Sequence, residues 1–457
     1  MLNVLKIDTP SLGDRCYLVH DGHVALVVDP QRDIDRILSL VEREGVKVTH
    51  VAETHLHNDY VTGGLALATA TGACYLVNGE DPVKFDRQRV RDGDEIAIGA
   101  NWLVRVMATP GHTYNHLSYV LVEGDSPIAV FSGGSLLHGS TGRPDLLGPE
   151  NTDVLARHQY ASAHRLAAEL PDCANVYPTH GFGSFCAATQ TETLASTIGD
   201  EKQNNAALTE DEEAYVTGLL AGLDEWPTYY VHMEPLNAAG PSIPDFTPPV
   251  PADKDTLRER IVGGEWVIDL RHRKAFAAGF VPGTFSFGLD GKFATYVGWL
   301  IPRGCPITVL GETADQVAEA QRELTRIGID RLEGAATGGP EDWTDGPLGS
   351  FQRASFTELD AVRRHRPIAV LDVRRNLERS LSHIDGSVHV PLHNLLERMG
   401  DVPAREVWIY CNTGYRASIA ASILAANGHD VVAVDEDYDG VFATDLPIVE
   451  SEGPTVG

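Results

Sequence analysis

The second half of the chain contains an internal repeat, and this feature constrains the fold more than any other. VIDLRHRKAFAAGFVPGTF at residues 267–285 aligns without a gap on VLDVRRNLERSLSHIDGSV at residues 370–388, and Asp269 matches Asp372. In each copy a short apolar run leads into a loop and then a helical pattern. The repeat therefore predicts two homologous α/β modules.

A proline-rich segment separates this repeat from the first half of the chain. Residues 236–255 contain five prolines and show neither helical nor strand periodicity, which is typical of an extended linker. A chain of 457 residues is also too long for one ordinary domain of about 100–200 residues. We expect a first domain at residues 1–237, a linker at 238–255, a first repeat module at 256–345 and a second at 346–457.

Charge and composition exclude several classes of partner. The 36 basic and 65 acidic residues give a formal net charge of -29, which opposes binding to nucleic acids and to anionic membranes. The chain has neither an apolar run of about 20 residues nor a signal-peptide pattern. Scattered cysteines suit a reducing compartment, so a cytoplasmic protein is expected, and homo-oligomerisation stays open. The cysteines are Cys16, Cys74, Cys173, Cys186, Cys305 and Cys411.

Cys411 lies on a turn between a predicted strand at 407–410 and a predicted helix at 417–427. Backbone N–H groups at such a turn, with Arg416 closing it, would stabilise a thiolate and hold an anion beside it. The alternative interpretation is a buried cysteine that only packs at the end of a strand. Gly414 and Arg416 favour the reactive interpretation.

The loop resembles that of rhodanese sulfurtransferases, which carry sulfane sulfur as a cysteine persulfide on a six-residue loop. Cysteine phosphatases have a longer loop. The resemblance implies small thiol persulfides, thiosulfate and sulfite as partners, with Cys411 and Arg416 as catalytic residues. In the preceding module Gly311 and Gln316 occupy these two positions, so that module resembles a pseudo-rhodanese with a structural or docking role. The residues between Cys411 and Arg416, expected to bind substrate, are Asn412, Thr413, Gly414 and Tyr415.

A second motif, THLHND, spaces His55, His57 and Asp59 at alternate positions. His112 in TPGHT and His180 in YPTHG each follow an apolar run and a proline. Alternating ligands converge on one point where the loop curls around a metal ion. A buried, hydrogen-bonded histidine is the alternative for each of them.

The order of VVDP, THLHND, TPGHT, FSGGSLL and YPTHG resembles the metallo-β-lactamase fold, a four-layer αββα sandwich with metals at one edge. The fusion to two rhodanese-like modules is similar to that of bacterial persulfide dioxygenases. The resemblance implies an α/β chain: an N-terminal αββα sandwich followed by two α/β rhodanese-like domains.

Two positions depart from that family. Tyr60 stands where most members have a histidine, and Gly134 stands where they have an aspartate ligand. The persulfide dioxygenase iron set is therefore incomplete. We predict one transition metal, Fe(II) in preference to Zn(II), with weak or absent binding if the site is degenerate. The predicted ligands are His55, His57 and His112, and the predicted outer or second-site residues are Asp59, His180 and Tyr60.

Three functions remain open. The first is a sulfide-oxidation enzyme, in which the metal domain oxidises a persulfide to sulfite and Cys411 transfers sulfane sulfur. The second is a glyoxalase II type hydrolase that cleaves a thioester. The third is a silent first domain that serves the rhodanese as a scaffold. An aspartate placed at Gly134 is expected to restore a ligand and raise metal affinity.

Overall fold

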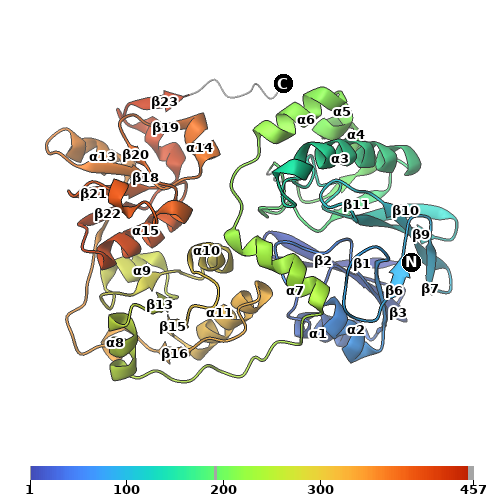
Figure 1. The fold of residues 1–457 in the computed structure, drawn as a ribbon, viewed down its shortest axis with the longest axis horizontal. Coiled ribbons are helices and arrows are strands. Elements are labelled where there is room, and N and C mark those ends of the chain that lie inside the picture. The colour runs from blue at the N-terminus through green and yellow to red at the C-terminus, as the bar shows by residue number, and fades with distance from the viewer. Residues whose placement is uncertain (1, 190–192, 451–457) are drawn as a thin grey trace. The chain divides into compact units, whose positions relative to one another are not determined.

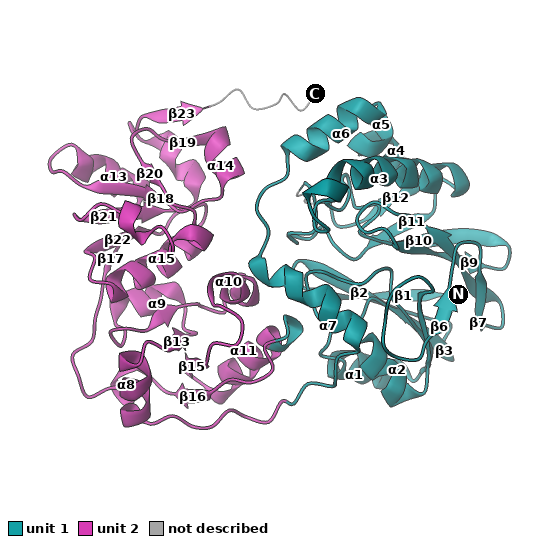
Figure 2. Ribbon diagram, in the orientation of Figure 1, with its two compact units in different colours: residues 1–245, 325–328 teal, residues 246–324, 329–457 magenta. Residues whose placement is uncertain are grey.

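The computed structural model describes residues 2–189 and 193–450, and the chain forms two compact units (Figure 2). The first unit comprises Met1–Asp245 and Thr325–Gly328, and the second comprises Phe246–Leu324 and Ile329–Gly457. Both are mixed α/β structures, which agrees with the predicted fold class. No helix within the described ranges is long and apolar enough to cross a membrane.

Two mixed sheets form the centre of the first unit (Figure 1). Among the described residues the first sheet has the order β1-β2-β3-β4-β5-β6 and the second has the order β12-β11-β10-β9-β8-β7. The first contains β1 (Asn3–Thr9), β2 (Asp14–His20), β3 (Val24–Val28), β4 (Lys47–Ala52), β5 (Cys74–Asn78) and β6 (Gln88–Val90). The second contains β7 (Glu95–Gly99), β8 (Trp102–Ala108), β9 (Leu117–Glu123), β10 (Ser126–Gly133), β11 (Asn175–Pro178) and β12 (Ser196–Thr197).

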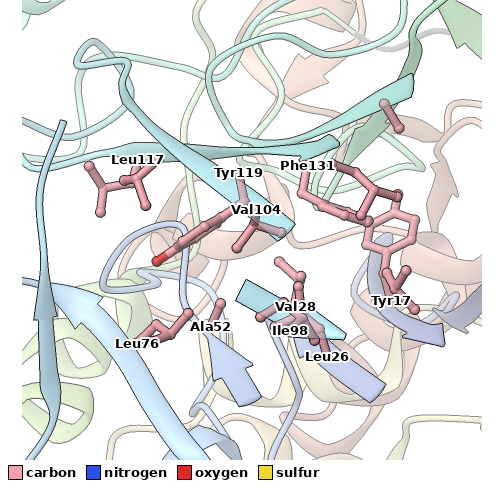
Figure 3. Packing of buried hydrophobic residues seen from close by; sticks show 14 of the residues in the cluster. Tyr17, Leu26, Val28, Ala52, Leu76, Ile98, Val104, Leu117, Tyr119 and Phe131 are labelled. Carbon is pink, nitrogen blue, oxygen red and sulfur yellow. The ribbon is translucent and has the colours of Figure 1, made fainter. Parts of the chain in front are cut away.

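Alternating side chains produce three buried layers around these sheets. In β9, Tyr119 and Leu121 face the first sheet, while Val120 and Val122 pack with helices on the opposite face. The layer between the sheets contains Tyr17, Val28 and Phe131 among others (Figure 3). Helices cover both outer faces, which makes the four-layer αββα sandwich. They are α1 (Asp35–Glu44) and α2 (Gly64–Thr71) on one side and α3 (Pro149–Glu169), α4 (Ile198–Asn204), α5 (Ala206–Thr209) and α6 (Glu212–Ala221) on the other.

The end of the first unit folds back onto the sandwich. The 3-10 helix η1 (Thr228–His232) leads into α7 (Met233–Ala239), whose Asn237 is fully buried. Residues 240–250 then contain neither helix nor strand. The sequence predicts an extended linker over this proline-rich segment, but its first residues belong to α7, where Met233 and Asn237 pack inside the first unit. Its last two residues, Lys254 and Asp255, belong to α8, which packs through Leu257.

The second unit contains two parallel sheets that reproduce the repeat. Their strand orders are β14-β13-β15-β16 and β17-β22-β21-β18-β20 in the described part of the chain. Asp269 accepts hydrogen bonds from the Arg271 side chain, and Asp372 accepts them from Arg374 in the same way. The repeated letters therefore correspond to the same buried ion pair in each module.

The elements of the second unit follow in chain order. The first module contains α8 (Lys254–Val262), β13 (Trp266–Asp269), α9 (Arg273–Ala278), β14 (Phe285–Ser286), α10 (Phe293–Leu300), β15 (Ile307–Gly311), α11 (Ala314–Arg326), β16 (Gly334–Thr337) and α12 (Pro340–Trp343). The second contains β17 (Gln352–Ala354), α13 (Phe356–Arg363), β18 (Ala369–Asp372), α14 (Asn376–Leu381), β19 (Ser382–Ile384), β20 (Val388–His389), η2 (Leu392–Asn394), η3 (Met399–Asp401), β21 (Val407–Tyr410), α15 (Tyr415–Ala426), β22 (Val431–Val434), η4 (Tyr438–Ala443) and β23 (Ile448–Glu450).

Candidate metal centre and cysteine loop

The histidines of the first unit meet on loops that follow strands of the two sheets. His55 and His57 follow β4, His112 follows β8, and His180 follows β11. All four are buried. Ligand atoms of His55, His112 and His180 lie within 4.8 Å of one another, and so do those of His57, Asp59 and His180. The chain thus gathers its histidines as a metal site requires.

His112 is oriented with one nitrogen toward the centre of the group. Its Nδ1 donates a hydrogen bond to the carbonyl oxygen of Arg143 at 2.8 Å. Its Nε2 is buried and has no hydrogen-bond partner among the described residues. Burial, assisted by repulsion from His180, lowers the pKa of His112 to about 3. A neutral imidazole with a fixed tautomer and an unshared lone pair is the form that binds a metal.

Polar groups contact one nitrogen of the His57 ring, Nε2. Its Nε2 lies 2.9 Å from the Tyr60 hydroxyl and 3.3 Å from both Asp29 Oδ1 and Glu53 Oε2. Burial opposes protonation while Asp29 and Glu53 favour it, and the balance raises the pKa of His57 to about 9. The Nδ1 atom is buried without a partner in the described structure. Nδ1 is therefore the nitrogen that His57 can offer to a metal, after it has lost the proton that the raised pKa places on the ring.

Tyr60 is a neighbour of His57 in this arrangement. Its ring stacks on the imidazole with centroids 4.3 Å apart, and its hydroxyl also donates to the carbonyl oxygen of Asp29 at 3.3 Å. Burial raises the pKa of Tyr60 well above its ordinary value, so the phenol stays neutral. The tyrosine that departs from the family pattern thus orients His57 through a hydrogen bond.

His55 and His180 approach each other across the group. Their Nε2 atoms lie 3.3 Å apart, and the Nδ1 of His180 is 2.9 Å from Asp14 Oδ1 and 3.2 Å from Asp59 Oδ2. The other oxygen of Asp59, Oδ1, is buried and unpartnered among the described residues. Asp59 therefore combines a contact to His180 with one free ligand atom.

Three buried atoms without hydrogen-bond partners among the described residues are of ligand types. His57 Nδ1, His112 Nε2 and Asp59 Oδ1 are buried, and each is a ligand type that Fe(II) and Zn(II) accept. His55 and His57 fall into different close groups, which meet at His180. The ligand set of His55, His57 and His112 stays a prediction, and His180 and Asp59 lie close enough to share in it.

Gly134 lies against the His112 ring. A Cβ atom at this position would be 2.7 Å from Cγ and 3.0 Å from Nε2 of His112. The Gly134 N–H donates to Nε2 of His116 at 3.0 Å. On this backbone the side chain of an aspartate would begin in the space that the His112 ring occupies, which argues against the expected added ligand. The effect of Gly134→Asp on metal affinity stays a prediction.

Several residues that contact the site are not predicted from the sequence. Asn237 donates from Nδ2 to the carbonyl oxygens of His57 and Tyr60, each at 2.9 Å, and the Tyr229 hydroxyl donates to the Asp59 carbonyl at 3.1 Å. The aromatic segment around Tyr229 showed only a packing pattern. Asp29 stands in VVDP, one of the motifs that carry the family resemblance, and the structure holds it at φ 52, which is unusual for a residue other than glycine.

In the second unit, Cys411 lies buried between β21 and α15. Its Sγ accepts the N–H of Gly414 at 3.2 Å and the N–H of Ala417 at 3.4 Å. Gly414, with φ 86, is the N-cap of α15. These donors point at the sulfur from the positive end of the helix, where negative charge is stabilised.

The other loop residues are fixed from outside. The Asn412 carbonyl accepts the N–H of Tyr438 at 2.7 Å, and the Tyr415 hydroxyl donates to the Gly288 carbonyl at 2.8 Å. Gly288 belongs to the preceding module, so the two modules touch at this loop.

Arg416 does not extend a free guanidinium toward the sulfur. Its two terminal nitrogens donate to the two oxygens of Glu378 at 2.6 and 2.7 Å. Burial alone would raise the pKa of Glu378, but the charges of Arg416 and Arg375 outweigh burial and lower this pKa to about 2. The charge of Arg416 is balanced inside the protein, so the contacts that reach Sγ come from backbone N–H groups.

Known proteins resemble both halves of the chain. The model of the rhodanese-like domain matches residues 355–444. Persulfide dioxygenase ETHE1, mitochondrial, of Homo sapiens is 28% identical over 206 residues, which cover 45% of this chain and 72% of that protein. Hydroxyacylglutathione hydrolase of Rhodopseudomonas palustris strain BisA53 is 32% identical over 234 residues, which cover 46% and 88%. A crystal structure of a metallo-beta-lactamase from Staphylococcus aureus subsp. aureus COL superposes with a TM-score of 0.65 and 27% identity, covering 74% of this chain and 99% of that one.

Proposed function

The chain belongs to the metallo-β-lactamase-fold family that includes hydroxyacylglutathione hydrolases and the persulfide dioxygenase ETHE1, and we propose that it is a two-site enzyme of sulfur metabolism. The second site follows from its rhodanese-like domain. Cys411 carries sulfane sulfur in the second unit. The histidine group of the first unit would hold a metal that supplies the chemistry for oxidation of a small thiol persulfide by dioxygen. The observation that carries the proposal is the pair of backbone N–H groups aimed at Cys411 Sγ.

The proposed transfer at Cys411 has two steps. The thiolate attacks the outer sulfur of thiosulfate, a new S–S bond forms, and sulfite leaves with the electron pair of the broken S–S bond. An acceptor thiolate then attacks the outer sulfur of the Cys411 persulfide and releases the Cys411 thiolate. Both steps keep negative charge at Sγ or beside it, where the N–H groups of Gly414 and Ala417 stabilise it.

In the first unit, the residues proposed to hold the metal are already oriented. The Arg143 carbonyl fixes the tautomer of His112, and Tyr60, Glu53 and Asp29 restrain His57. Fe(II) bound there would supply the redox chemistry that oxidation of a persulfide by dioxygen needs. The protein's own contribution is to hold the ligands and to keep their surroundings dry.

A hydrolase is the second candidate for the first unit. Hydroxyacylglutathione hydrolases are among its relatives, and His57, Asp59 and His180 form a second close group beside His55 and His112. Zn(II) would supply Lewis-acid chemistry to such a reaction. Asp59 with its free oxygen would then act as a ligand, whereas an iron site built on His55, His57 and His112 leaves it outside.

Replacement of Cys411 by serine tests the sulfur-transfer site. We expect Cys411→Ser to abolish thiosulfate:thiol sulfur transfer and the mass increase of one sulfur atom on the peptide that contains residue 411. Cys305→Ser is the matched control, because Cys305 is a partly buried cysteine of the same unit outside the loop. Transfer at the wild-type rate by Cys411→Ser would contradict the assignment.

Metal loading separates the two candidates for the first unit. The chain is loaded anaerobically with Fe(II) or Zn(II), its metal content is measured, and oxygen uptake is followed with glutathione persulfide. One iron per chain with persulfide-dependent uptake supports the dioxygenase. Thioester cleavage with zinc and no oxygen uptake with iron supports the hydrolase.

A further inference from the structure

The module that lacks a cysteine contributes a cationic side chain to the Cys411 loop. Arg273, the first residue of α9, donates from Nη2 to the carbonyl oxygen of Thr413 at 3.3 Å. Thr413 lies in the loop between Cys411 and Arg416. This contact joins the two repeat modules inside one unit, at the loop proposed to carry sulfur.

The Thr413–Gly414 peptide links this contact to the sulfur. Its N–H, which belongs to Gly414, donates to Cys411 Sγ at 3.2 Å, while its carbonyl oxygen accepts from Arg273. A trans peptide is planar, and its C=O and N–H bonds point in opposite directions. Arg273 and Cys411 Sγ therefore bind opposite sides of one peptide unit. A cation at the oxygen polarises that unit and makes its N–H a stronger donor.

Carboxylates from both modules fix the guanidinium. Arg273 Nε donates to Asp435 Oδ1 at 2.7 Å, and Nη1 donates to Asp290 Oδ2 at 2.6 Å. The Arg273 side chain is 19% exposed and that of Asp435 is 3% exposed, so this is a largely buried pair. Charge-assisted bonds of this kind hold a planar guanidinium in one orientation.

Gly414 keeps the peptide close to this network. Its φ of 86 lies in the left-handed region, and a Cβ atom there would be 2.9 Å from Cα of Asp435. Only glycine combines this backbone with so close an approach. The backbone of Asp435 thus packs against Gly414, while its carboxylate anchors Arg273.

We propose that Arg273 is a positioning residue for sulfur transfer: it orients and polarises the Thr413–Gly414 peptide, whose N–H stabilises negative charge on Cys411 Sγ. The proposal deepens the proposed function and rests on Cys411 as the sulfur carrier. In the repeat alignment the position of Arg273 is occupied by Asn376 in the second module. The second module therefore has no arginine at that position, and the cysteine-less module supplies one.

The test uses Arg273→Met in the full chain. Two quantities are measured: the rate at which iodoacetamide alkylates Cys411, followed on its peptide by mass spectrometry, and the kcat and KM of thiosulfate:thiol transfer. We expect the alkylation rate and kcat each to fall about 3- to 10-fold, because a charged hydrogen-bond partner of the donor peptide is lost. The KM for thiosulfate should change less than about twofold, and Arg273→Lys should recover part of kcat.

Arg353→Met is the matched control. Arg353 also forms an ion pair with Asp435. The hydrogen bond to the Thr413 carbonyl comes from Arg273. Arg353→Met should therefore keep the wild-type alkylation rate and kcat. Wild-type alkylation and kcat in Arg273→Met, or an equal loss in Arg353→Met, would overturn the proposal. If the wild-type chain transfers no sulfur but Arg273→Met still slows alkylation, the proposed function fails and the positioning role stands.

Discussion

Replacing Gly134 with alanine perturbs the metal centre with a single methyl group. The new Cβ would lie 2.7 Å from Cγ of His112, whereas non-bonded carbon atoms rest about 3.5–4.0 Å apart. The His112 ring would have to move by roughly 1 Å. It is fully buried and bonded to the Arg143 carbonyl, so the movement strains or breaks that hydrogen bond.

Two effects of Gly134→Ala follow. Overpacking of a buried site costs about 1–3 kcal/mol of unfolding free energy. Loss of the contact that orients a ligand lowers metal affinity by about 10- to 100-fold. Gly134→Asp should act in the same direction, because its side chain begins at the same Cβ.

Urea unfolding of the metal-free chain measures the first effect, and anaerobic competition with a chelator for Zn(II) or Fe(II) measures the second. Gly218→Ala is the control, since a Cβ at Gly218 in α6 would meet nothing within 4 Å. That variant should bind metal as the wild type does. A Gly134→Ala chain with wild-type affinity, or a Gly134→Asp chain with higher affinity, would refute the reasoning.

Further predictions concern the polar partners of the two sites. Glu378→Gln leaves the buried Arg416 without its carboxylate, so urea unfolding should show a loss of about 3 kcal/mol at neutral pH. The folded pKa of Glu378, about 2, lies below its ordinary value of 4.5. The stabilisation by the Glu378 carboxylate should therefore be complete above pH 4.5 and disappear as the pH falls toward 2. The unfolding free energies of Glu378→Gln and the wild type should converge at that acidic pH. Tyr60→Phe keeps the ring that stacks on His57 but removes the hydroxyl that bonds to it. Chelator competition should show a metal affinity about 10-fold lower than that of the wild type. Unchanged affinity would mean that the hydroxyl does not orient His57.

Local patterns in the sequence were enough to predict the architecture. The apolar run at 407–410 and the turn after it correspond to β21 and the Cys411 loop. The matched Asp269 and Asp372 mark the same ion pair in both modules. Such features can be predicted because strand and helix periodicity, glycine positions and repeated letters depend on residues close together in the chain.

The orientation of the site residues was decided by the tertiary structure. The pairing of Arg416 with Glu378, the contact of Gly134 with His112 and the reach of Arg273 to Thr413 join residues that are separated in the chain. Sequence reasoning assigned Arg416 to the anion and position 134 to an added ligand. In the structure Arg416 pairs with Glu378, because a buried guanidinium takes a nearby carboxylate, and the packed His112 ring fills the space beside Gly134. The role of Arg416 in holding an anion stays a prediction.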